Sequence, residues 1–404
     1  MPARSRSVVV AGGGIVGLAA AAVIRRSAPR VHVVVVDPKI DGIEIPEAIG
    51  QRVIALTPAS INVFEQLAVL PTMPDFALTP YHRMRVWDAG VSAGEGIEFA
   101  SHLQGMDNLG AIADVASLQA ALYQALLLDD AVTFRQAEIV GLESRSGSVV
   151  TALSDNERIE SSLVVGADGR NSKVRDCLGS DLRRWSHHQC AVVATLEAEL
   201  DHQSTALQRF LPTGPLALLP LQASQVSLVW STTTEHAREL VSMPPDRFSD
   251  AVSEASDRVL GRLQATSRVV SFKLESAYVT NPIGPRAVLI GDAAHAIHPL
   301  AGQGANLGFS DAVALAGVIA DAVDEQADFG DPPWLRRYRR MRRSDNLTTL
   351  FGLDFVNRLF ARETGVLADL RRRGMRWFGQ SQIARQLAIS HASAMRGADP
   401  LRQP

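Results

Sequence analysis

Apolar residues form short uninterrupted runs at the start of the chain, which is typical of strands buried on both faces. Val8–Ala11 and Val31–Val36 are two such runs, and the alanine-rich segment Ile15–Arg26 between them favours a helix. Together they predict a β-α-β unit. The strand pattern returns at Ser162–Val165 and at Ala287–Ile290, and a Gly and an Asp follow each of these runs.

The middle of the chain has a different pattern. Cys190–Leu196, Ala217–Leu221 and Gln225–Ser231 alternate or cluster like the strands of a mixed or antiparallel sheet. After Asp311 the pattern becomes helical and rich in arginine. This order predicts a nucleotide-binding domain built from separated segments, interrupted by a sheet domain and followed by C-terminal helices.

The composition fits a globular protein with a large core, because 46% of the 404 residues are hydrophobic and 21% are charged. The formal net charge of −3 is unevenly placed: residues 331–404 carry 15 Arg and no Lys against 6 acidic residues. A core of this size does not suggest a nucleic-acid partner. Cys177 and Cys190 lack metal-ligand spacing and fit a reducing cytoplasm.

The apolar run from Val8 to Ile24 superficially resembles a secretion signal or a membrane span, because Arg4 and Arg6 precede it. Glycines interrupt the run, however, and no A-x-A-like cleavage site is followed by a polar start. We therefore expect a cytoplasmic protein that does not cross a membrane, although it could lie on the inner face of one.

The first strand leads into a G-x-G-x-x-G motif that consists of Gly12, Gly13, Gly14, Ile15, Val16 and Gly17. Gly12 allows a tight turn, Gly14 lets the backbone approach a pyrophosphate, and Gly17 lets the helix pack closely on the sheet. The N-terminus of that helix favours negative charge. Asp37 ends the second strand, where a carboxylate accepts hydrogen bonds from ribose hydroxyls. These features predict a site for an unphosphorylated dinucleotide such as FAD or NAD.

Two further motifs directly follow strands, at Gly166–Arg175 and at Gly291–Gly308. Asp292 stands at a strand end, where it can hold a ribityl or ribose hydroxyl. The segment Gly302–Gly304 lets backbone amides approach a flat ring or a phosphate at an expected helix start. Each motif alone also fits an ordinary strand-turn-helix with a cap, but three in this order favour a dinucleotide site.

The order of the motifs resembles that of the para-hydroxybenzoate-hydroxylase-like flavoprotein monooxygenases and, within them, of the ubiquinone-biosynthesis hydroxylases. The similarity runs from about Val8 to about Asn346. The stretches that carry it are Arg52–Ser60, Met84–Asp88, Gln208–Pro220, Ser227–Ser231 and, most specifically, Gly291–Gly308. One departure is Asp114-Val115, where the family often has an acid followed by Asn.

The resemblance implies an α/β fold in which a discontinuous, glutathione-reductase-type Rossmann-like FAD-binding domain carries an inserted mixed β-sheet substrate domain and C-terminal helices. The expected FAD-binding segments are 1–75, 101–182 and 275–345. The expected substrate-domain segments are 76–100 and 183–274, and the expected helical region is 346–404.

The resemblance also implies which residues bind the cofactor. The first motif and Asp37 would hold the ADP half of FAD, and Asp168 would touch both FAD and a visiting NAD(P)H. The implied residues are Gly12, Gly14, Ile15, Val16, Gly17, Asp37, Arg52, Gln119, Asp168, Gly169, Asp292, Pro299, Gly302, Gln303, Gly304, Ala305 and Asn306.

The chemistry implied by the resemblance belongs mainly to the flavin. NAD(P)H binds transiently, and the reduced flavin reacts with O2 to form a C4a-hydroperoxide that hydroxylates a phenol. The implied substrate is a prenylated phenol on the route to ubiquinone. No catalytic side chain is identified, although His295, His298 and Pro299 are expected near the flavin. The two histidines lack further ligands nearby, so we expect packing roles for them and no metal.

Several features have two interpretations. Trp87, Trp185 and Trp230 could line a substrate cleft or belong to the sheet core. The leucines at 216–221 suit a polyprenyl tail or a plain core. The arginines at 336–343 suit a solvated helix face or a segment at an anionic membrane. The function has alternatives too: a flavin hydroxylase of another small aromatic compound, or a flavin-binding, non-catalytic subunit of a ubiquinone-biosynthesis complex.

Overall fold

A six-stranded sheet forms the centre of the nucleotide-binding part in this computed structural model, which describes residues 6–297 and 303–360. Its strand order is β19-β20-β12-β1-β2-β8, and all neighbours are parallel except the β19–β20 pair. The strands are β1 (Ser7–Ala11), β2 (His32–Val36), β8 (Val132–Arg135), β12 (Leu163–Gly166), β19 (Ile283–Gly284) and β20 (Ala287–Leu289). The four apolar runs predicted as strands are neighbours in this sheet.

Both faces of the six-stranded sheet are covered, which explains why its strands are continuously apolar. Val8 and Val10 face the core shared with helices α1 (Ile15–Ser27), α3 (Val115–Leu127) and α7 (Gln303–Asp324). Val9 faces the opposite side. That side is covered by helix α4 (Lys173–Cys177) and by the antiparallel strands β9 (Ile139–Arg145), β10 (Ser148–Leu153) and β11 (Arg158–Ser161).

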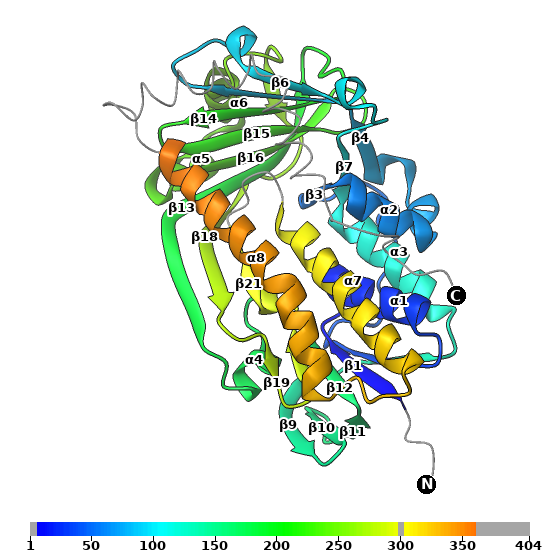
Figure 1. Ribbon diagram of the computed structural model, residues 1–404. Helices are drawn as coiled ribbons and strands as arrows, with labels where there is room; N and C mark the ends of the chain where they lie inside the picture. Colours follow the sequence, from blue (N-terminus) through cyan, green and yellow to red (C-terminus); the bar gives the residue numbers. More distant parts are fainter. Residues whose placement is uncertain (1–5, 298–302, 361–404) are drawn as a thin grey trace.

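A larger mixed sheet lies above the first one in Figure 1, and the long strands β13 and β18 extend from it toward the nucleotide-binding part. Its main path is β21-β18-β13-β16-β15-β14-β5-β6, with β17 paired to β13; only the β14–β5 pair is parallel. The strands are β5 (Arg83–Asp88), β6 (Ile97–Ala100), β13 (Leu182–Ala198), β14 (Thr205–Leu211), β15 (Gly214–Pro220), β16 (Gln225–Thr233), β17 (Leu263–Ala265), β18 (Val270–Val279) and β21 (His295–Ala296).

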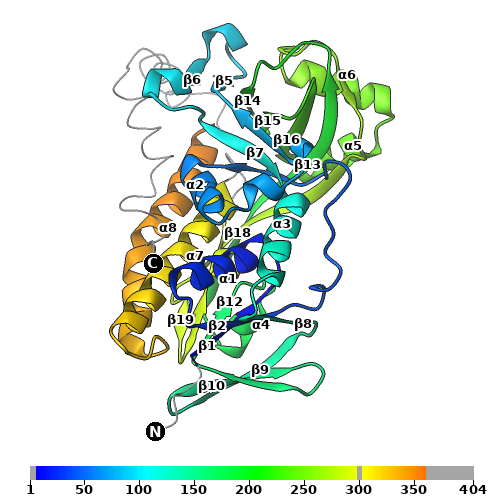
Figure 2. The ribbon, with the colours of Figure 1, turned by 90° about the vertical axis from the view of Figure 1, so that its right-hand side faces the viewer.

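The two faces of the mixed sheet have different partners. One face packs on helices α5 (Thr234–Ser242) and α6 (Pro245–Ala255), with Trp87 and Trp230 buried between them. The other face looks toward the nucleotide-binding part (Figure 2). Because side chains alternate along a strand, residues that follow one another in the sequence belong to different environments here.

A small sheet and two helices complete the described fold. The sheet joins β3 (Val53–Leu56), β7 (Gly110–Asp114) and β4 (Leu78–Tyr81), and helix α2 (Pro58–Gln66) follows β3. Helix α8 (Pro332–Phe360) lies beside α7 (Figure 1). The short 3-10 helices are Leu70–Thr72, Asp75–Ala77, Ala93–Glu95, Ser101–Gln104 and Gly291–Ala293.

Helix α7 is the one helix in the described ranges that is long and apolar enough to cross a membrane by length and composition. Inside the protein, however, 72% of its apolar window is buried. Its buried side chains pack against α1 and the six-stranded sheet. This is the environment of a core helix.

Candidate functional site

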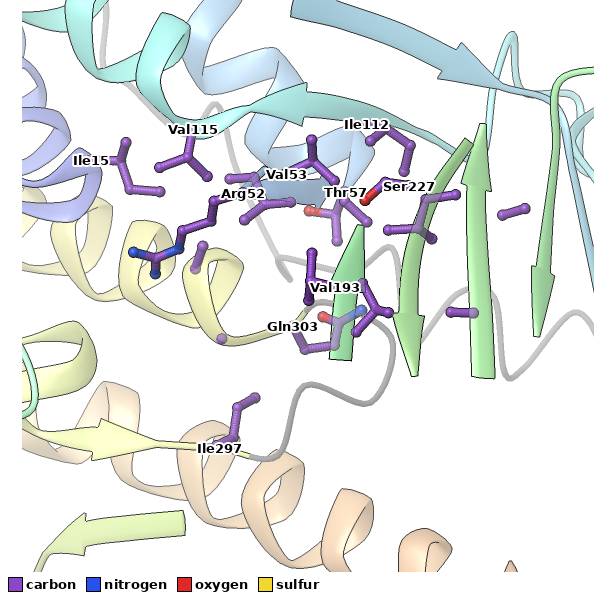
Figure 3. Close-up of a pocket in the computed structure, with 18 of the residues that line it drawn as sticks. Ile15, Arg52, Val53, Thr57, Ile112, Val115, Val193, Ser227, Ile297 and Gln303 are labelled. Atoms are coloured by element: carbon purple, nitrogen blue, oxygen red, sulfur yellow. The ribbon is translucent and has the colours of Figure 1, made fainter. Parts of the chain in front are cut away.

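A cavity of about 1110 Å³ lies where the nucleotide motifs meet the exposed face of the mixed sheet (Figure 3). The small β3-β7-β4 sheet forms another part of its wall, through residues such as Val53 and Ile112. Ligand cavities in proteins commonly measure roughly 300–1,000 Å³. This one therefore has room for a cofactor ring system together with a second molecule.

The first glycine motif has the geometry of a pyrophosphate cradle. Gly12 has φ +105°, and a Cβ there would lie 2.4 Å from the carbonyl oxygen of Ala167. A Cβ at Gly17 would lie 2.0 Å from the Gly12 oxygen, so the helix and the turn are in close contact. A Cβ at Gly14, by contrast, would meet nothing within 4 Å.

Helix α1 leaves its first N–H groups available at this open space. Its N-cap is Gly14, no side chain caps it, and its first turn contains no acidic residue. Gly14, Ile15 and Val16 line the cavity. An anionic pyrophosphate fits such a helix start, because the unpaired N–H groups and the helix dipole both favour negative charge.

Asp37 and Gln119 both bind the backbone of Gly13. The Asp37 carboxylate accepts from the Gly13 N–H at 2.8 Å and from the Lys39 N–H at 2.8 Å. Gln119 donates from Nε2 to the Gly13 carbonyl at 2.7 Å and lines the cavity. Arg52 also lines it, and Figure 3 shows its guanidinium directed away from the strands of the mixed sheet.

The second motif is joined to the third across the cavity wall. Asp168 accepts at Oδ2 from the N–H groups of Lys173 and Val174, so it caps α4, while its Oδ1 is buried and unpartnered within the described residues. Gly169 and Arg170 line the cavity. Arg170 pairs with Asp292 of the third motif at 3.3 Å, and Asp292 also lines the cavity.

The start of α7 forms part of the wall through Gln303, Gly304 and Ala305. Asn306 points elsewhere: its side chain accepts from Ser60 Oγ at 2.8 Å and donates to the Ala55 carbonyl at 2.8 Å. It therefore ties α7 to β3 and α2. His298, Pro299 and Gly302 lie outside the described residues.

His295 lies behind the cavity wall, in a buried charge network. Its Nε2 is 2.6 Å from Asp311 Oδ2, and Arg342 Nε donates to Asp311 Oδ1 at 2.8 Å. The Gly291 N–H and Asn346 also donate to Asp311. Burial raises the pKa of Asp311, but His295 and Arg342 lower it further through charge and hydrogen bonds, so the net shift is downward. The network joins α7, α8 and the third motif.

Asp311 and Arg342 were not predicted from the sequence. The available signal was an acid inside an otherwise apolar helix segment, a pattern that calls for a buried partner. Among the described residues no group of three or more His, Cys, Asp or Glu is arranged to hold a metal ion.

The mixed sheet shows which of the ambiguous residues face the cavity. Trp87, Trp230, Leu216 and Leu218 are buried on the α5–α6 side, and Leu219 faces the cavity. The cavity face consists mainly of small and aliphatic residues, which are Met84, Phe99, Val193, Ala206, Gln208, Pro215, Ala217, Leu219, Ser227, Val229, Ser231, Val270 and Phe272. Sequence reasoning missed the polar members of this set, Gln208, Ser227 and Ser231.

Tyr81, at the end of β4, was also missed. Its phenol lines the cavity opposite the mixed sheet. Burial raises the pKa of Tyr81 to about 12. The phenol therefore stays protonated, and able to donate, at any pH at which the protein would be assayed.

The combination of three nucleotide motifs and a mixed sheet around one cavity defines an FAD-dependent monooxygenase. Klebsiella pneumoniae HpxO in complex with FAD has the same fold, with a TM-score of 0.75 at 18% identity over 97% of this chain and 100% of that one. The p-nitrophenol 4-monooxygenase PnpA from Pseudomonas putida also has a TM-score of 0.75, at 16% identity over 97% of this chain and 100% of that one.

Sequence comparison gives the family. Residues 5–345 match the family described as "FAD binding domain". The human mitochondrial ubiquinone biosynthesis monooxygenase COQ6 is 33% identical over 91% of this chain and 88% of its own length. The Escherichia coli 3-demethoxyubiquinol 3-hydroxylase is 28% identical over 97% and 99%. The chain belongs to the ubiquinone-biosynthesis hydroxylase family of para-hydroxybenzoate-hydroxylase-like FAD-dependent monooxygenases.

Family membership confirms the predicted fold class and enzyme class, with FAD as the bound cofactor and NAD(P)H as the reductant. It also agrees with a small molecule as the substrate. The domain boundaries and the roles of individual site residues stay predictions.

Proposed function

We propose that this protein hydroxylates the aromatic ring of a prenylated phenol, a ubiquinone precursor, with FAD, NAD(P)H and O2. The observation that carries the proposal is the apolar face of the mixed sheet, which shares one cavity with the flavin motifs. The relatives support the same substrate class, because they are named as ubiquinone biosynthesis enzymes.

The charge distribution of the cavity favours a neutral substrate over an aromatic acid. On the sheet face, the described lining residues include no Lys or Arg. The cavity's two arginines, Arg52 and Arg170, belong to the flavin side, and Arg170 is already paired with Asp292. A substrate carboxylate next to the sheet would therefore be buried without a counter-charge, which is costly.

The residues of the three motifs fit the two ends of FAD in this proposal. The α1 N-terminus would hold the pyrophosphate, and Asp37 would approach the ADP ribose. Asp292 and the start of α7 would hold the ribityl chain and the ring system, with Arg52 and Gln119 beside them. Asn306 and Asp311 would act indirectly, by holding β3 and the third motif in place.

When bound and reduced by NAD(P)H, FAD supplies the activated oxygen; one oxygen atom of O2 goes to the ring and the other leaves as water. The protein's part is to place the ring and keep bulk water away. Val193, Ala217 and Val229 form a dry floor for the ring and its tail. Tyr81 offers a neutral hydrogen-bond donor on the opposite wall.

The experiment is to purify the holoenzyme, record its flavin spectrum, and follow NADH and NADPH oxidation under air with 2-prenylphenol and with 4-hydroxybenzoate. We expect flavin absorption bands and oxidation stimulated by 2-prenylphenol, with a hydroxylated product detected by mass spectrometry. Stimulation by 4-hydroxybenzoate alone would overturn the substrate class. Bound flavin without any stimulated turnover would favour a non-catalytic, flavin-binding subunit.

A further inference from the structure

Two polar side chains on the cavity face of the mixed sheet have no hydrogen-bond partner among the described residues. Gln208 on β14 is 6% exposed and lines the cavity. Ser227 on β16 is 1% exposed, and its hydroxyl is buried and unpartnered in the described part of the chain. Figure 3 shows Ser227 on the wall formed by the strands, with its hydroxyl directed toward the cavity.

Buried polar groups in folded proteins nearly always have a partner, because an unmade hydrogen bond leaves the cost of desolvation uncompensated. Neither group contributes to the core on the other side of the sheet, which is apolar around α5 and α6. Both lie instead on the face that the substrate would touch. A ligand in the cavity is therefore the natural partner for both.

The strand register sets the distance between the two groups. Gln208 pairs with Ala217, and Ala217 pairs with Val229, which is two residues from Ser227 on β16. Two strand spacings across the sheet and two residues along it separate the Cα atoms by about 12 Å. The long side chain of Gln208 shortens the gap, and Ala217 leaves its floor low. One six-membered ring fits between the amide and the hydroxyl.

We propose that Gln208 and Ser227 recognise the oxygen substituents of the substrate ring and thereby set which ring edge faces the flavin. Gln208 accepts from the ring hydroxyl through Oε1, and Ser227 donates from Oγ to the oxygen on the neighbouring ring carbon. This inference rests on the proposed function, since it assigns specificity residues for a phenolic ring. Accepting from the hydroxyl also increases the electron density of the ring, which favours its attack on an electrophilic oxygen.

The test pairs each variant with a probe that lacks the matching oxygen. The probes are 2-methoxy-6-prenylphenol, 2-prenylphenol without the methoxy group, and 1-methoxy-3-prenylbenzene without the hydroxyl. Dissociation constants come from perturbation of the flavin spectrum in the holoenzyme, and KM and kcat from the two phenols. The variants are Gln208→Met, which is close in shape, and Ser227→Ala, with Gln208→Ala as a second test of the first site.

We expect Gln208→Met to weaken binding of both phenols about tenfold or more, and to leave binding of 1-methoxy-3-prenylbenzene unchanged. Ser227→Ala should weaken binding only of the two methoxy compounds. Loss of ring orientation should also lower the yield of hydroxylated product per NAD(P)H. Equal weakening of all three probes, or no weakening, would overturn the inference.

Gln225→Leu is the matched control. Gln225 lies on the same strand and the same face as Ser227, two residues away, and outside the cavity lining. It should leave the dissociation constants unchanged. Failure of the inference is distinguishable from failure of the proposed function: if the wild type hydroxylates prenylphenols but the variants keep its discrimination, only the inference fails. If the wild type hydroxylates none of them, the proposed function fails.

Discussion

Removing the charge of Asp311 should destabilise the protein strongly. Asp311 is fully buried, and it binds the charged side chain of Arg342, which is itself only 10% exposed. Asp311→Asn keeps the size of the side chain but leaves the guanidinium without its main buried counter-charge. Breaking a buried ion pair by removing one partner typically costs about 3–5 kcal/mol. Asp345, 3.3 Å from Arg342, offers partial compensation, so we expect a loss of about 3 kcal/mol.

Urea unfolding of the holoenzyme at fixed excess FAD, followed by tryptophan and flavin fluorescence, measures this loss. The double variant Asp311→Asn/Arg342→Met is the control, because it removes the unpaired charge as well. It should be more stable than the single variant. A single variant as stable as the wild type, or a double variant less stable than the single one, would refute the reasoning.

The same carboxylate gives the stability an acid dependence. The folded-state pKa of Asp311 lies below its ordinary value of 3.8, because His295 and Arg342 outweigh the effect of burial. A depressed pKa contributes stability that is present above the unfolded-state pKa and is lost as the pH falls through the folded-state pKa. The difference between wild type and Asp311→Asn should therefore be constant from pH 6 to 8 and shrink below about pH 4. A difference that stays constant on acidification would contradict this assignment.

Two further predictions concern the cofactor and the surface. Gly12→Ala should destabilise even the apoprotein, because φ is +105° and the new Cβ meets backbone at 2.4 Å; Gly14→Ala should leave apoprotein stability unchanged and weaken only FAD affinity. Thermal unfolding with and without FAD separates the two. If exposed arginines of α8 attract anionic membranes, changing Arg336, Arg340 and Arg343 to Glu should reduce sedimentation with anionic vesicles and not with neutral ones; unchanged sedimentation would contradict it.

The nucleotide site was predictable from the sequence because its requirements are local. A turn such as that at Gly12 needs a particular backbone conformation, and an open helix start needs a residue without a side chain, as at Gly14. The strands before each motif were predictable as well, since β1 and its neighbours are buried on both faces and must be continuously apolar. The same local patterns carry the family resemblance.

Only the tertiary structure decided which side chains share an environment. Alternation along β16 separates Val229 from Trp230, but it does not say which one faces the cavity; the packing of α5 and α6 against one face decides it. Asn306 and Ala55 are 251 positions apart, and Asp311 and Arg342 lie on two different helices. Contacts of this kind depend on how whole elements pack, and a local pattern cannot encode them. Sequence therefore determined where the cofactor motifs are, and packing determined what surrounds the substrate.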